Sequence, residues 1–133
     1  MSEDASSAAD DAEPKVVART GDDRRVSVYR VVHSTELAHL RVTGNYGSNP
    51  HRSGKYFALT LAGAQAFARA PFNAGSTITS TTLPRSVIDQ SFRFYDPGQH
   101  GAGPSVFFGQ RELAIVYGAM TPPVVVPNSG QRS

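Results

Sequence analysis

Residues 54–60 read Gly-Lys-Tyr-Phe-Ala-Leu-Thr, and they follow a β-branched segment that ends Val28-Tyr29-Arg30. A glycine- and asparagine-rich loop separates the two segments. A guanidinium at the end of a strand can hold a phosphate through two hydrogen bonds. The neighbouring Tyr56 and Phe57 offer a planar group a surface on which to stack. The two segments together predict a cleft for a phosphate-bearing nucleotide.

The remaining pattern predicts a mixture of short strands and helices. Thr60 is placed to cap an alanine-rich helix that ends near Ala70, and Ser34 to cap a helix that ends near Val42. Residues 84–90 are expected to form a helical turn, and residues 112–117 fit a strand or a helix equally well. Strands are expected at residues 25–32, 55–59, 77–83, 92–95, 105–108 and 123–126. These elements predict an α+β fold with two small, packed, mainly antiparallel sheets and peripheral helices.

The charge of the chain is distributed unevenly along its 133 residues. Residues 1–23 hold seven acidic and two basic side chains, and this Ser- and Ala-rich stretch is predicted to be a disordered acidic leader. The rest carries eleven basic and four acidic residues, so a net charge of +2 conceals a basic domain. Residues 24–127 are predicted to be one folded domain and residues 128–133 a frayed tail. A basic domain favours an anionic partner.

Several kinds of chemistry are excluded by what the sequence lacks. There is no cysteine, so disulfides, thiolate metal sites and cysteine nucleophiles are ruled out. The four histidines show no paired metal-ligand spacing, and no metal site is expected. No apolar stretch approaches the length of a membrane span, and the acidic start is unlike a signal peptide.

The order of these motifs resembles that of the ADP-ribosyltransferase toxin domains found at the C-termini of bacterial polymorphic (Rhs-type) effectors. It comprises a strand ending in Tyr-Arg, a helix, the Gly-Lys-Tyr-Phe motif, an alanine-rich helix and a late Gln-x-Glu. The resemblance implies that Arg30 contacts the phosphates of NAD. It implies that Tyr56, Phe57 and Thr60 shape the nicotinamide pocket. It implies that Gln110 and Glu112 form the catalytic motif.

The same resemblance implies the biological role. The domain is expected to transfer one ADP-ribose from NAD to a bacterial macromolecule, a translation factor or ribosomal RNA. The protein would be a delivered effector that acts in the cytoplasm of a target cell during interbacterial competition. A cognate immunity protein is the expected partner, and no membrane partner is expected.

Elimination among the acidic residues supports Glu112 independently of the resemblance. Glu36 falls in the first turn of a predicted helix, where a carboxylate compensates the helix dipole. Asp89 and Asp96 fall in turns, and Asp96 precedes Pro-Gly.

Arg30 falls on the apolar phase of its strand, where a charged side chain is costly to bury unless an anion meets it.

Three other functions fit the sequence. A metal-independent ribonuclease would use His100 or His51 with Glu112 as an acid–base pair. An NAD glycohydrolase would break NAD without transfer. A non-catalytic module would bind an anionic partner through its basic face. The loop of residues 45–53, with His51 and Arg52, could close over a nucleotide.

Overall fold

The computed structural model describes residues 24–48 and 54–127. The predicted acidic leader (1–23) and frayed tail (128–133) lie outside the described residues, as do His51 and Arg52 of the predicted closing loop. None of the helices in the described part of the chain has the length and apolar character that a membrane crossing requires.

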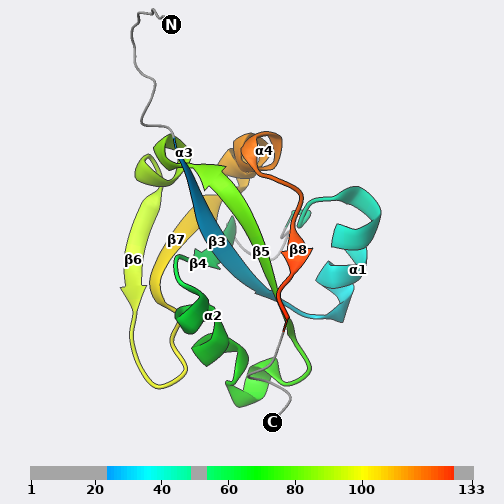
Figure 1. Cartoon of the computed structure of the whole chain (residues 1–133), viewed down its shortest axis with the longest axis vertical. Helices are drawn as coiled ribbons and strands as arrows, with labels where there is room; N and C mark the ends of the chain where they lie inside the picture. The colour runs from blue at the N-terminus through cyan, green and yellow to red at the C-terminus, as the bar shows by residue number, and fades with distance from the viewer. Residues whose placement is uncertain (1–23, 49–53, 128–133) are drawn as a thin grey trace, which may run out of the picture.

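Strands and helices succeed one another in short elements (Figure 1). The strands are β3 (Arg25–Val32), β4 (Gly54–Ala58), β5 (Thr77–Pro84), β6 (Phe92–Asp96), β7 (Gly103–Gly109) and β8 (Val124–Val125). The helices are α1 (Ser34–Thr43), α2 (Leu61–Ala68), the 3₁₀ turn η1 (Pro71–Asn73), α3 (Arg85–Asp89) and α4 (Gln110–Ala119). The predicted α+β class is confirmed.

The six strands form one open antiparallel sheet in the order β6-β7-β4-β3-β5-β8. The expectation of two small sheets is therefore not confirmed. The reason is a single residue pair, Tyr29 with Ala58, which joins β3 to β4. This pair connects what the sequence pattern presents as two separate groups of strands.

The junction between β3 and β4 is much weaker than its neighbours. β3 pairs with β5 along all eight of its residues, and β4 pairs with β7 along all five of its own. Beyond Tyr29 and Ala58, β3 and β4 diverge. The sheet consequently consists of two well-paired halves, β6-β7-β4 and β3-β5-β8, which part over most of their common border.

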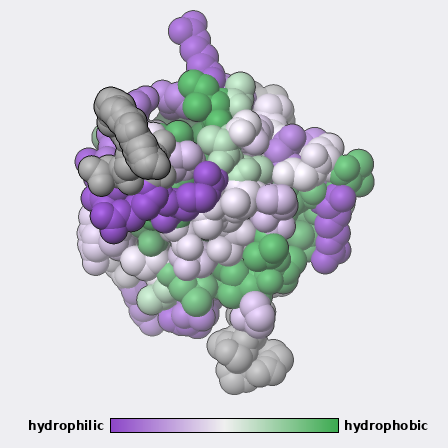
Figure 2. Space-filling view, turned by 45° about the horizontal axis from the view of Figure 1, so that its top comes forward, coloured by the Kyte–Doolittle hydropathy of each residue, from purple (hydrophilic) through white to green (hydrophobic). Residues whose placement is uncertain are grey.

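Apolar side chains cover both faces of the sheet. On one face Val28, Phe57 and Phe108 pack with Leu40 of α1 and Leu113 of α4 in the larger core. The opposite face carries a smaller core beneath α2, in which Ala58 and Ile78 meet Ala64 and Ala68. Figure 1 shows α2 in the lower half of the molecule and α4 at the top. Hydrophobic residues also reach the surface among hydrophilic ones (Figure 2).

The helix ends follow local rules, with one correction. Thr60 caps α2 as predicted, because its hydroxyl accepts a hydrogen bond from the Gly63 N–H at 3.0 Å. Ser34, by contrast, lies inside α1, and the residue at the cap position is His33, which makes no side-chain cap bond. Residues 112–117, which fit a strand or a helix by sequence, lie within the helix α4 (Gln110–Ala119).

Candidate functional site

A cavity of about 580 Å³ opens where β3 and β4 part. Its lining comes from β3, β4, β6 and β7 on one side, and from α2 and η1 on the other. Small residues leave the space open, since Ala58, Ala64, Ala102 and Ser105 all line it. The volume falls within the range of small-molecule sites in proteins, about 300–1,000 Å³.

Arg30 occupies the parting between the two strands. Its Nη1 donates a hydrogen bond to the backbone carbonyl of Tyr56 in β4 at 2.9 Å. A strand neighbour would supply an N–H to that carbonyl in a continuous sheet. The guanidinium therefore substitutes for missing backbone pairing, and it also lines the cavity.

Glu36 of α1 supplies the anion that the largely covered Arg30 side chain requires. Its two carboxylate oxygens accept from Arg30 Nε at 2.5 Å and Nη2 at 2.9 Å, a two-point ion pair. Glu36 Oε2 also lies 3.5 Å from Lys55 Nζ. The interpretation of Glu36 as a residue that merely compensates a helix dipole is wrong. Its carboxylate is only 19% exposed and neutralises two cations of neighbouring strands.

Lys55 is a site residue that the sequence reasoning missed. It lines the cavity, and 3% of the residue is exposed. Burial lowers the pKa of its ammonium group, the nearby Arg30 lowers it further, and Glu36 opposes both effects. The available signal was strand alternation, which places Lys55 on the same buried phase as Phe57.

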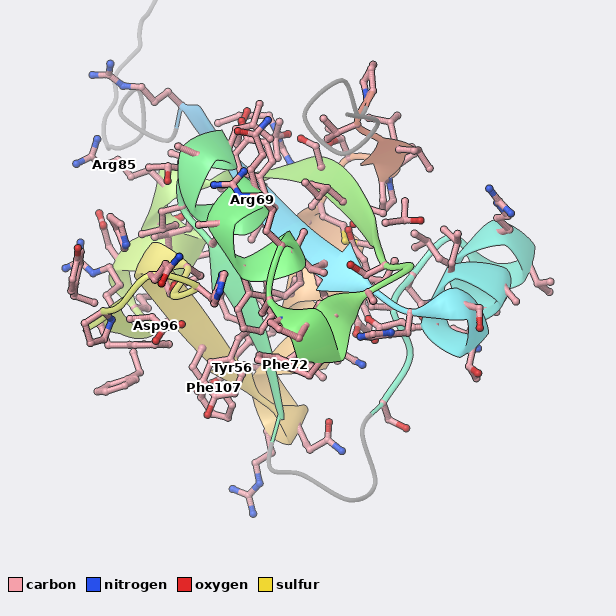
Figure 3. All side chains as sticks on the ribbon, turned by 90° about the horizontal axis from the view of Figure 1, so that it is seen from below. Tyr56, Arg69, Phe72, Arg85, Asp96 and Phe107 are labelled. Atoms are coloured by element: carbon pink, nitrogen blue, oxygen red, sulfur yellow. The ribbon has the colours of Figure 1, made fainter. Side chains whose placement is uncertain are left out.

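The two predicted aromatic residues, Tyr56 and Phe57, are neighbours on β4, and their side chains point to opposite faces of the sheet. Phe57 points into the larger core, where 1% of it is exposed and its ring meets Tyr46 edge-on at 5.4 Å. Tyr56 points to the other face, is 51% exposed and lies 4.7 Å from Phe107 between ring centroids. Figure 3 shows Tyr56 and Phe107 side by side, with Phe72 of η1 nearby. Of the pair, only Tyr56 is available to stack on a ligand.

A second polar group of the cavity, His33 with Asn73, was also missed. Asn73 is buried, and its Nδ2 donates to the Phe67 carbonyl at 2.8 Å. Its Oδ1 must therefore face His33 Nε2, which lies 2.8 Å away. Because Oδ1 only accepts, the proton sits on Nε2 and Nδ1 of a neutral His33 is an acceptor. No local sequence motif links these residues, which are 40 positions apart.

The other predicted residues lie beside the cavity and do not line it. Thr60 caps α2, and Gln110 begins α4. Glu112 is exposed, and its Oε1 accepts from the Gly109 N–H at 2.6 Å, which caps α4. Gly109 is paired directly with Gly54, which does line the cavity. Glu112 is thus linked to the cavity wall through Gly109 and its strand partner Gly54.

Asp96 is the carboxylate that lines the cavity in the described part of the chain. Its Oδ2 accepts from the Ala102 N–H at 3.0 Å, which confirms its predicted role in closing the loop after β6. His100, proposed for a ribonuclease, lies in the same loop but outside the cavity lining, and its Nδ1 is buried without a hydrogen-bond partner among the described residues.

Comparison with protein-family models, with curated proteins and with solved structures found no match for this chain.

Proposed function

We propose that the domain binds NAD in the cavity at the parting of β3 and β4 and transfers its ADP-ribose to a macromolecule. The observation that carries this proposal is the composition of one cavity. Two cations with little exposure, Arg30 and Lys55, and two aromatic side chains, Tyr56 and Phe94, all contribute to its lining. The cations can bind the phosphates of a nucleotide. The aromatic side chains offer its planar ring a surface on which to stack.

The cations have donors left for a phosphate. Arg30 carries five N–H groups, of which three are engaged by Glu36 and Tyr56 in the described part of the chain. Lys55 carries three, one of which faces Glu36. A pyrophosphate entering the parting would therefore find donors without first displacing Glu36.

The near-separation of the sheet supports an ADP-ribosyltransferase-like fold. A single residue pair joins its halves, and the cavity lies along their border. The proposal thus retains the two-sheet arrangement as an interpretation of the two halves, β6-β7-β4 and β3-β5-β8.

The reaction needs a carboxylate and no leaving-group acid. Nicotinamide departs as a neutral molecule, taking the electron pair of the bond between nitrogen and ribose. A carboxylate stabilises the positive charge that develops on the ribose. We assign this role to Glu112, with Gln110 orienting the incoming nucleophile, because Glu112 accepts from Gly109, the strand partner of cavity-lining Gly54. The nucleophile forms the new bond to the ribose and loses its proton.

The test is incubation of the chain with labelled NAD and a bacterial lysate, with Glu112→Gln and Glu112→Ala in parallel. Glutamine keeps an oxygen that can accept from the Gly109 N–H, whereas alanine removes the cap and should cost about 1 kcal/mol of stability. We expect Glu112→Gln to retain the wild-type unfolding midpoint and to lose label transfer by about 100-fold or more.

Each other outcome has a distinct meaning. A fully active Glu112→Gln would remove Glu112 from the mechanism. Nicotinamide release without label in protein or RNA would indicate an NAD glycohydrolase. If the folded wild-type domain consumes no NAD, the proposal fails. Cleavage of RNA without NAD would then favour the ribonuclease.

A further inference from the structure

An aromatic surface extends from the cavity across three adjacent strands. We call Tyr56, Phe92, Phe94 and Phe107 the aromatic platform. Tyr56 is paired opposite Phe107, and Phe107 opposite Phe92, so these residues share one face of β4, β7 and β6. Phe94, two residues after Phe92, lies on the same face.

The rings of the platform form a contiguous array. Tyr56 meets Phe94 at 5.5 Å and Phe107 at 4.7 Å between ring centroids. Phe92 and Phe94 are stacked at 5.6 Å with 19° between their planes. Phe92 is 65% exposed and Tyr56 51% exposed, so the array presents ring surface to solvent. Figure 3 shows two of these residues, Tyr56 and Phe107, beside each other.

We propose that the aromatic platform binds unpaired bases of single-stranded RNA, and that RNA is the acceptor class of the proposed transfer. The second clause rests on the proposed function, while the binding itself does not. Aromatic side chains spread over neighbouring strands of an open sheet face are a recurrent way to stack two or three RNA bases. Two platform residues, Tyr56 and Phe94, also line the cavity, so a stacked base would lie next to the bound NAD.

The charge of the domain fits a polyanion. The described residues include nine Lys or Arg and four acids. Each acid is already engaged: Glu36 with Arg30 and Lys55, Asp89 with Arg85 and Arg93, and Asp96 and Glu112 with backbone N–H groups. Exposed Arg111 lies in the first turn of α4, which follows β7, whereas Arg93 of β6 lies on the strand face opposite Phe92 and Phe94. The guanidinium of Arg111 can meet a phosphate of a strand that crosses the platform.

The size of the platform favours RNA over a protein partner. A stable protein interface uses about 20–30 residues on each side. The platform offers four rings on strands five to seven residues long, which matches a few nucleotides.

The test measures binding of a fluorescein-labelled, unstructured oligoribonucleotide by anisotropy, without NAD. Phe92→Ala removes an exposed ring that lies outside the cavity lining. Tyr95→Ala is the matched control, because Tyr95 is 69% exposed on the same strand but on its opposite face. We expect Phe92→Ala to weaken RNA binding at least about fivefold. Tyr95→Ala should leave it unchanged.

Several results would overturn the inference. They are no RNA binding by the wild type, equal losses in the two variants, or tighter binding of DNA of the same sequence. NAD breakdown is assayed separately without RNA, so failure of the proposed NAD chemistry is distinguishable from failure of the platform. If RNA binds and NAD is consumed but only protein is labelled, RNA is not the acceptor.

Discussion

Glu36 holds together the charges on which the cavity depends. Without its carboxylate, the guanidinium of Arg30 and the ammonium of Lys55 would face each other with little access to water, since their side chains are 15% and 4% exposed. Breaking a buried ion pair by removing one partner typically costs about 3–5 kcal/mol. The local sequence could not show this, because the three residues meet only when β3, α1 and β4 fold together.

Glu36→Gln should therefore lower the free energy of unfolding by about 3 kcal/mol, measured by urea denaturation. Asp89→Asn is the matched control. Asp89 also pairs with two cations, Arg85 and Arg93, but its carboxylate is 49% exposed, so we expect a change of less than about 1 kcal/mol. Equal losses in the two variants would contradict a special role for burial at Glu36.

At the scale of elements, two helical glycines have opposite surroundings. Gly63 in α2 packs against the loop after β6, and a Cβ there would stand 1.9 Å from the Ala102 carbonyl oxygen. At Gly118 in α4, no atom of residues 24–48 or 54–127, apart from the adjacent residues and the backbone of α4 itself, comes within 4 Å of the same position. Alanine is the better helix former in both places, by about 1 kcal/mol. Only at Gly63 does packing oppose this preference.

Gly118→Ala should accordingly raise the free energy of unfolding by about 0.5–1 kcal/mol. Gly63→Ala should lower it, because the loop that contributes Ala102 to the cavity has to move. Thermal unfolding of both variants measures the difference. An increase in the free energy of unfolding on Gly63→Ala would contradict this prediction, because it would show that the loop can move without an energetic penalty.

The elements themselves were largely predictable, and their association was not. The β-branched pattern of β3 and the Thr60 cap of α2 are local signals, and both were confirmed. α4 was ambiguous because its short apolar run fits either period, and burial of Leu113 and Val116 decides for a helix. The single pair of Tyr29 with Ala58 and the hydrogen bond between His33 and Asn73 depend on long-range packing, which no local pattern encodes.

At the scale of the whole molecule, the stability should fall at alkaline pH. Burial raises the pKa of Tyr46 to about 12, and burial also raises the pKa of Tyr117. The unfolded chain then loses the Tyr46 proton near pH 10 while the folded protein keeps it. Its contribution is thus complete below pH 10 and is lost as the pH rises towards 12. The lowered pKa of Lys55 has the opposite effect. As the pH rises towards the ordinary lysine pKa of 10.5, this group contributes more to the free energy of unfolding.

Tyr46→Phe should reduce the alkaline loss between pH 10 and 12 by about 2 kcal/mol, measured by urea denaturation at several pH values. It should also lower stability at neutral pH by about 1 kcal/mol, because the 2.7 Å hydrogen bond to Thr79 is removed. Tyr95→Phe, which changes an exposed side chain, should leave the alkaline loss as in the wild type. An unchanged pH profile for Tyr46→Phe would contradict the assignment.

The weak junction between β3 and β4 gives the sheet a built-in hinge. Along that border, one backbone pair and the side chain of Arg30 join two rigid plates, each held together by complete strand pairing. The Arg30 side chain thus spans the opening between the plates. Turning one plate against the other would leave every strand paired within its own plate, and it would require the larger core, in which Val28 packs with Phe57 and Phe108 across the border, to repack.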